Sequence, residues 1–143
     1  MRISYLDMDG NTMSVDRIAQ GTDFIAEVTI TNPGARGYLQ EMALNHVFPS
    51  GWEIHNTRMD EFISAVQTDY ATYQDFRDDR VYTYYNIAAN TTKTFKVKLN
   101  AAYQGKFYLP TVTTEAMYDH TIHSRIPGKW VEIVSPDQEI AEE

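Results

Sequence analysis

The chain has 143 residues, 13% aromatic residues, no cysteine and a formal net charge of −8. A chain of this length is expected to form one domain and to bury roughly 70% of the surface that its unfolded form exposes. The negative charge argues against nucleic acid and anionic lipid as partners, and the lack of cysteine excludes disulfides, thiolate metal sites and cysteine nucleophiles.

The first half of the chain reads as strands separated by turns. Ile3, Tyr5 and Met8 open a strand, and the Asp9-Gly10 pair that follows is a strong hairpin signal. The clearest alternation puts four apolar side chains on one face: Phe24, Ala26, Val28 and Ile30. A longer strand, from Tyr38 to Phe48, has the same period at Met42, Leu44, His46 and Phe48.

The second half continues this pattern. Strands are predicted at Trp52 to His55, at Phe95 to Leu99, at Phe107 to Leu109 and at Lys129 to Val134. Val81, Thr83 and Tyr85 alternate with Tyr82 and Tyr84, which predicts a central strand covered on both faces.

The register of the apolar positions changes at Pro110. Phe107 and Leu109 are odd, whereas Val112 and Ala116 are even. Because proline cannot donate a hydrogen bond to a sheet, the change predicts a bulge or a switch between sheets.

One segment departs from the strand pattern, because apolar residues recur at helical spacing from Met59 to Tyr73. It predicts one short helix or a long loop near residues 58–73. Together these patterns predict an all-β fold, an antiparallel sandwich of about seven to nine strands in a single domain over residues 1–143, with a frayed acidic tail at 136–143. No apolar run reaches the length of about 20 residues that spans a membrane, so direct membrane insertion is not expected. No signal peptide is visible, so if the protein is exported this chain is a fragment of a longer one.

No residue type in this sequence forms a convincing catalytic or metal site. Asp119, His120 and His123 are the strongest metal candidates, but on a strand the two histidines point to opposite faces. The Asp7 to Asn11 segment is more typical of a hairpin turn than of a calcium loop. Arg77, Asp78, Asp79 and Arg80 carry alternating charges that predict a salt-bridged loop rather than an acid/base pair. We therefore expect no enzyme activity, no cofactor and no bound metal.

Met117 is an exception to the expected polarity of its strand. Val112, Thr114 and Ala116 share one face, so Met117 falls on the opposite face among polar side chains. Strand parity turns Tyr118 inward, unless the strand ends at Ala116 and leaves Tyr118 beside Met117. An apolar side chain on a polar face is typical of a contact surface.

Several short signatures carry a resemblance to a known family. In chain order they are Arg77-Asp78-Asp79-Arg80, Leu99-Asn100-Ala101-Ala102-Tyr103, Phe107-Tyr108-Leu109-Pro110, Glu115-Ala116-Met117-Tyr118-Asp119 and Arg125-Ile126-Pro127-Gly128-Lys129-Trp130. This series resembles the C-terminal macroglobulin-like domain of bacterial alpha-2-macroglobulins, which trap endopeptidases in the periplasm. The resemblance is strongest from Phe76 to Asp119 and fails between Met59 and Tyr73.

The resemblance implies a non-catalytic domain with an immunoglobulin-like sandwich. In the family, this domain packs on the thioester domain of the same chain, and a Met-Tyr pair matching Met117 and Tyr118 keeps water from the thioester. The implied partners are therefore the thioester domain, the neighbouring macroglobulin domains and, through the whole protein, target proteases. The implied location is the periplasm, with the parent anchored as a lipoprotein.

Two other functions fit the sequence. A surface adhesin or carbohydrate-binding sandwich would expose two or three coplanar aromatic rings on one face. An accessory domain of an enzyme would have its catalytic partner upstream. An upstream Cys-x-Glu-Gln sequence and a lipoprotein signal would favour the macroglobulin reading.

Overall fold

The computed structural model describes residues 1–55 and 73–136, in which the regular elements are twelve strands arranged in three sheets. The all-β prediction is confirmed, although the described residues alone contain more strands than the seven to nine expected. None of them belongs to a helix long and apolar enough to cross a membrane.

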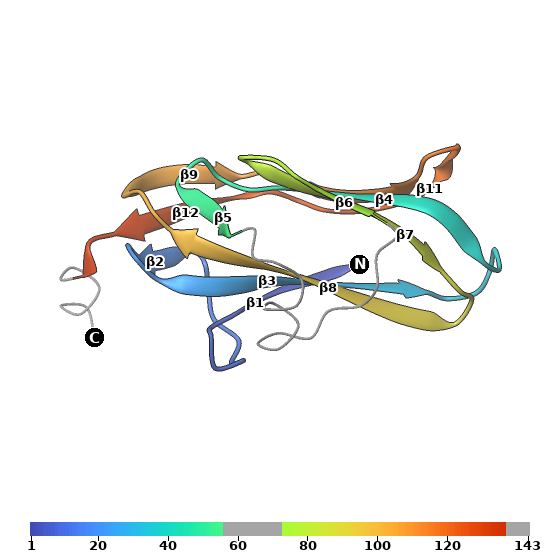
Figure 1. The fold of residues 1–143 in the computed structure, drawn as a ribbon, viewed down its shortest axis with the longest axis horizontal. Coiled ribbons are helices and arrows are strands. Elements are labelled where there is room, and N and C mark those ends of the chain that lie inside the picture. Colours follow the sequence, from blue (N-terminus) through green and yellow to red (C-terminus); the bar gives the residue numbers. More distant parts are fainter. Residues whose placement is uncertain (56–72, 137–143) are drawn as a thin grey trace.

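One layer is a four-stranded antiparallel sheet with the order β1-β3-β8-β5. The bounds of its strands are Arg2–Leu6 for β1, Asp23–Asn32 for β3, Thr91–Ala101 for β8 and Trp52–His55 for β5. The strands β3 and β8 pair without interruption from Asp23 opposite Asn100 to Asn32 opposite Thr91. They form the long axis of the molecule (Figure 1).

The opposing layer is divided between two sheets. The larger sheet has five strands in the order β11-β10-β4-β7-β6. Their bounds are Asp119–Ile126 for β11, Val112–Ala116 for β10, Leu39–Val47 for β4, Arg80–Ile87 for β7 and Tyr73–Phe76 for β6. The smaller sheet has three strands in the order β2-β12-β9, with the bounds Arg17–Ala19 for β2, Lys129–Val134 for β12 and Gly105–Leu109 for β9. Only the β2–β12 pair is parallel among the strand pairs of the described residues. In Figure 1, β4 and β11 lie opposite β3 and β8, while β9 and β12 lie at the end where the C-terminus is found.

The core follows this division and consists of two clusters. At one end Phe24 and Leu99 of the four-stranded sheet pack with Leu109 and Ile133 of the three-stranded sheet. At the other end Val28 and Phe95 pack with side chains of the five-stranded sheet. Nine apolar residues of the predicted strands are buried: Phe24, Val28, Ile30, Leu44, Phe95, Val97, Leu99, Leu109 and Val112.

The switch predicted at Pro110 is also confirmed. Leu109 ends β9 in the three-stranded sheet, and Val112 begins β10 in the five-stranded sheet. The chain therefore changes sheets across Pro110 and Thr111, which accounts for the change in the parity of its apolar residues.

Two details of the prediction are wrong. Met8 does not belong to the first strand, which ends at Leu6, and its side chain is exposed in the following turn. Strand β7 is not covered on both faces: Val81 and Tyr85 are buried, but Tyr82 and Tyr84 are only half-buried, because they point to the outer face of the five-stranded sheet.

Two predictions concern segments that lie almost wholly outside the described residues. The helix or loop at 58–73 falls outside the described residues apart from Tyr73, which begins β6. The frayed tail at 136–143 likewise falls outside them apart from Pro136.

Candidate functional site

Met117 and Tyr118 form the tip of a tight turn between β10 and β11. Strand β10 ends at Ala116, which pairs with Asp119, so the connection contains only these two residues. The side chain of Met117 is 45% exposed and that of Tyr118 is 81% exposed. Of the two arrangements that the sequence allowed for Tyr118, the structure has the outward one, because the strand ends before parity can turn the ring inward.

The backbone of this turn differs from that of the common two-residue hairpin. Such hairpins use turns with a positive φ at one or both central residues. Neither Met117 nor Tyr118 has a positive φ, which among the described non-glycine residues occurs only at Glu41 and Asn90. A register shift beside Ala116 accommodates the mismatch, since Glu115 pairs with His123 rather than with a residue next to Asp119.

Polar contacts hold the far side of the turn. The Asp119 carboxylate accepts hydrogen bonds from the backbone N–H of Thr121 at 3.0 Å and from its hydroxyl at 2.6 Å. Arg36, in the β3–β4 connection, donates to the Thr121 hydroxyl at 2.9 Å and lies 3.7 Å from Asp119. The exposed tip therefore stands on a restrained base.

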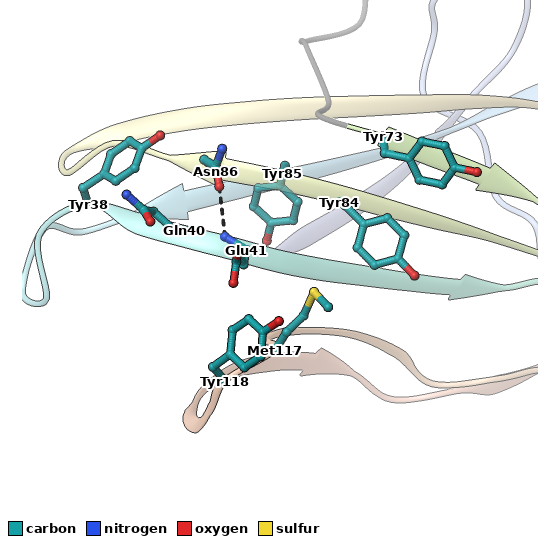
Figure 2. A pocket seen from close by; sticks show the side chains of 9 residues that line it. All are labelled: Tyr38, Gln40, Glu41, Tyr73, Tyr84, Tyr85, Asn86, Met117 and Tyr118. Carbon is teal, nitrogen blue, oxygen red and sulfur yellow. Dashed lines mark hydrogen bonds between the residues drawn. The ribbon is translucent and has the colours of Figure 1, made fainter.

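A groove of about 500 Å³ lies between this turn and the outer face of β4, β7 and β6. Figure 2 shows Met117 reaching from the turn toward Tyr84. Tyr73 and Tyr84 lie next to each other on neighbouring strands, with ring centroids 6.0 Å apart and an interplanar angle of 27°. The lining comprises Tyr38, Gln40, Glu41, Tyr73, Tyr84, Tyr85, Asn86, Met117 and Tyr118.

The chemistry of this lining suits contact rather than catalysis. It presents aromatic faces and a thioether, which adapt to an apolar partner, together with amide and hydroxyl groups that can fix its orientation. The one ionisable carboxylate in the lining, Glu41, has no histidine, lysine or arginine beside it there. We therefore regard the groove and the Met117–Tyr118 turn together as the candidate site.

The charged loop before β7 is a separate feature. Arg80 binds the carboxylate of Asp79 through two hydrogen bonds of 3.0 Å, and this lowers the pKa of Asp79. Arg77 pairs at 2.9 Å with Asp75, which lies outside the predicted motif. Asp78 has no ion pair with another residue in the described ranges, so the expected four-residue network is only partly formed. Because these pairs are exposed, their contribution to stability is small.

The backbone of the same loop has a structural role. The N–H of Arg77 donates to the carbonyl of Arg80 at 2.8 Å, and the N–H of Phe48 donates to the carbonyl of Asp79 at 2.8 Å. The loop thus joins the end of β4 to the start of β7.

The side chain of the metal candidate His120 lies outside the described part of the structure. Among the side chains that the structure describes, no group of three or more His, Cys, Asp or Glu is placed to hold a metal ion. Asp7 instead accepts hydrogen bonds from the backbone N–H groups of Asp9 and Asn11, at 2.9 Å each, as a hairpin turn requires.

Comparison with known proteins gives the family. The model of the bacterial alpha-2-macroglobulin MG10 domain matches residues 2–120. The chain belongs to this family. Among curated proteins it is similar to the alpha-2-macroglobulin of Rickettsia conorii, with 28% identity over 122 residues that cover 82% of this chain and 6% of that protein. The MG10 domain therefore represents a small part of the length of its relative.

Solved structures share the fold. Salmonella alpha-2-macroglobulin reacted with methylamine matches with a TM-score of 0.80 and 18% identity, over 94% of this chain and 9% of that one. Escherichia coli alpha-2-macroglobulin activated by porcine elastase matches with a TM-score of 0.78 and 17% identity, over 94% of this chain and 13% of that one.

The arrangement of the exposed aromatic rings bears on the carbohydrate-binding alternative. A sugar-binding face needs two or three coplanar aromatic rings, whereas the planes of the neighbouring Tyr73 and Tyr84 rings are inclined by 27°. The MG10 domain does expose further rings at Tyr38 and Tyr118, but these flank the groove rather than extend a plane (Figure 2).

Sequence reasoning identified the turn of this site but not its groove. Tyr38, Glu41, Asn86 and Tyr73 were not singled out. Tyr84 could have been found from the alternation in β7, since its side chain points to the face opposite that of the buried Tyr85. Tyr38 could not, because the parity of β4 predicted from Met42 onward turns it inward.

Proposed function

We propose that this MG10 domain packs on the thioester domain of a bacterial alpha-2-macroglobulin and shields the thioester bond with Met117 and Tyr118. It would act as the non-catalytic C-terminal domain of an inhibitor that traps endopeptidases. The observation that carries the proposal is the exposure of these two side chains at a restrained turn beside an aromatic groove.

The physical reason lies in the chemistry of acyl bonds. A thioester persists only where water is kept away from its carbonyl carbon, and a thioether beside an aromatic ring makes an adaptable, dry cover. Met117 and Tyr118 project from the domain surface, so they can reach a bond held by another domain. Side chains buried in the core of this domain could not do so.

The described relatives support this reading. The Salmonella relative was reacted with methylamine, a small nucleophile of the kind that opens acyl bonds, and an E. coli relative was activated by elastase, a protease. Both names fit a protein that carries a reactive acyl bond and responds to proteolysis. The same proposal assigns the parent protein to the periplasm, anchored as a lipoprotein, which fractionation and metabolic lipid labelling of the full-length parent would test.

The experiment measures free thiol in the full-length parent without protease. Met117→Ala combined with Tyr118→Ala should speed thiol release by about tenfold, which corresponds to about 1.4 kcal/mol of lost protection. The matched control combines Met8→Ala with Tyr103→Ala, which truncates a methionine and a tyrosine that are 45% and 57% exposed elsewhere on the domain. If thiol release in the Met117/Tyr118 variant equals that in the control, the shielding proposal is wrong.

A further inference from the structure

Strand β4 contains a bulge directly behind the Met117–Tyr118 turn. Leu39 pairs with Ile87 and Met42 pairs with Tyr85, so two residues of β4, Gln40 and Glu41, lie opposite the single residue Asn86. Glu41 has a φ of 55°, in the left-handed region that residues with a side chain adopt only at an energetic cost. Such a conformation persists where the surroundings hold it.

Two hydrogen bonds hold it here. The backbone N–H of Glu41 donates to the side-chain oxygen of Asn86 at 2.9 Å (Figure 2). The carbonyl of Glu41 accepts a hydrogen bond from the backbone N–H of Met117 at 3.0 Å. A continuous path therefore runs from the side chain of Asn86 on β7, through the backbone of Glu41 on β4, to the backbone of Met117.

This path anchors the first residue of the exposed tip. Strand β10 pairs with β4 up to Ala116 opposite Met42, and the bond from Met117 to Glu41 continues that register by one residue beyond the end of β10. Met117 is thereby fixed by its backbone while its side chain stays exposed. The anchor depends on the direction of the Glu41 carbonyl, which the bulge sets.

We propose that Asn86 and Glu41 are positioning residues that hold Met117 in place to cover the thioester; this rests on the proposed function. Asn86 keeps the bulge formed by accepting the N–H of Glu41. Without that acceptor the strand can relax toward a regular register, in which each side chain between Tyr38 and Glu41 changes face and the Glu41 carbonyl turns away from Met117.

The first experiment measures hydrogen exchange at the Met117 amide in the 143-residue chain. Asn86→Leu removes the acceptor and should speed exchange at Met117 by about tenfold or more, as expected when a hydrogen-bonded turn opens locally. Asn86→Asp keeps an acceptor oxygen and should restore slow exchange. In Glu41→Gly, the glycine tolerates the left-handed conformation, and its backbone N–H and carbonyl keep their hydrogen bonds to the Asn86 side chain and to the Met117 N–H. This variant should therefore also leave exchange slow.

The matched control is Asn100→Leu. Asn100 makes a comparable side-chain hydrogen bond, to Asp23 at 2.8 Å, but lies in β8 of the opposite sheet. Its loss should leave exchange at Met117 unchanged. If Asn86→Leu behaves like Asn100→Leu at the Met117 amide, the positioning inference is overturned.

The second experiment measures thiol release in the full-length parent and separates this inference from the proposed function. Asn86→Leu should speed release by a smaller factor than the Met117/Tyr118 double variant, with Asn86→Asp close to wild type. If the double variant speeds release and Asn86→Leu does not, the positioning inference is wrong and shielding stands. If the double variant itself has no effect, the shielding proposal is wrong, and exchange at Met117 still decides whether Asn86 and Glu41 hold the turn.

Discussion

The four-stranded and five-stranded sheets of this MG10 domain differ in regularity. In the first, β3 and β8 pair over their whole shared length with no shift of register. In the second, register shifts interrupt both the β4–β7 pair and the β10–β11 pair, and one strand contains a non-glycine residue with a positive φ. The groove, the tyrosines that line it and Met117 all lie on the irregular sheet or beside it.

This difference has a physical basis. A regular strand alternates its side chains, so an amphipathic sequence buries every apolar residue on one face. A side chain whose parity turns it inward becomes exposed only if the alternation is broken, by a bulge or by the end of the strand. The irregularities at Glu41 and Ala116 do this for Tyr38 and Tyr118, which lie beside the groove and the Met117–Tyr118 turn.

The largest expected effect comes from breaking the regular sheet. Phe24 in β3 is fully buried, and its ring meets Trp52 edge-on with centroids 5.0 Å apart. Phe24→Ala should lower the free energy of unfolding by about 3–5 kcal/mol, because it removes a large apolar side chain and leaves a cavity. Urea denaturation would measure it, and a loss below about 1 kcal/mol would mean that this sheet does not dominate stability.

A smaller effect is expected at the junction of the two core clusters. His46 in β4 is 2% exposed, its ring centroid is 4.2 Å from that of Phe48, and burial lowers its pKa to about 3. The unfolded chain, with an ordinary histidine pKa near 6.5, therefore binds a proton that the folded chain refuses as the pH falls below 6.5. The titration of His46 therefore leaves the free energy of unfolding unchanged above pH 6.5, and lowers it progressively as the pH drops from 6.5 toward about 3.

The contribution of His46 can be isolated by substitution. In the wild-type protein, the buried His46 should lower the free energy of unfolding by about 2 kcal/mol at pH 5 relative to neutral pH. His46→Leu should remove this part of the acid sensitivity, whereas the control His123→Leu, at an exposed position on β11, should retain it. Equal losses between pH 7 and pH 5 in wild type and His46→Leu would show that the buried imidazole is not responsible.

The smallest effect is expected at the tip of the irregular sheet. Because Met117 is 45% exposed, Met117→Ala should cost less than about 1 kcal/mol of stability, well below the 2–5 kcal/mol typical of a buried methionine. Urea denaturation beside Phe24→Ala would make the comparison direct. A cost above about 2 kcal/mol would assign Met117 to the core and weaken its proposed role as an interdomain contact.

Much of the fold could be predicted because the regular parts follow from local pattern. The alternation at Phe24, Val28 and Ile30 predicted the inner face of β3, and the parity change at Pro110 predicted the switch from β9 to β10. The predicted number of strands was too low. The outer face of β7 was wrongly predicted to be covered, because alternation identifies one buried face and does not show whether a second layer covers the other.

The sequence by itself determined the sandwich, its core side chains and the outward position of Met117, since each depends on neighbours along one strand. Only the tertiary structure decided the positions of Tyr38 and Tyr118 and the existence of the groove. Tyr38 faces outward because β4 bulges at Gln40 and Glu41, and nothing local marks that bulge, since its left-handed residue is a glutamate rather than a glycine. The bulge is held by Asn86, 45 residues away in the chain, and it in turn holds the backbone of Met117. Contacts between strands so far apart in the sequence leave no periodic signal along any one of them.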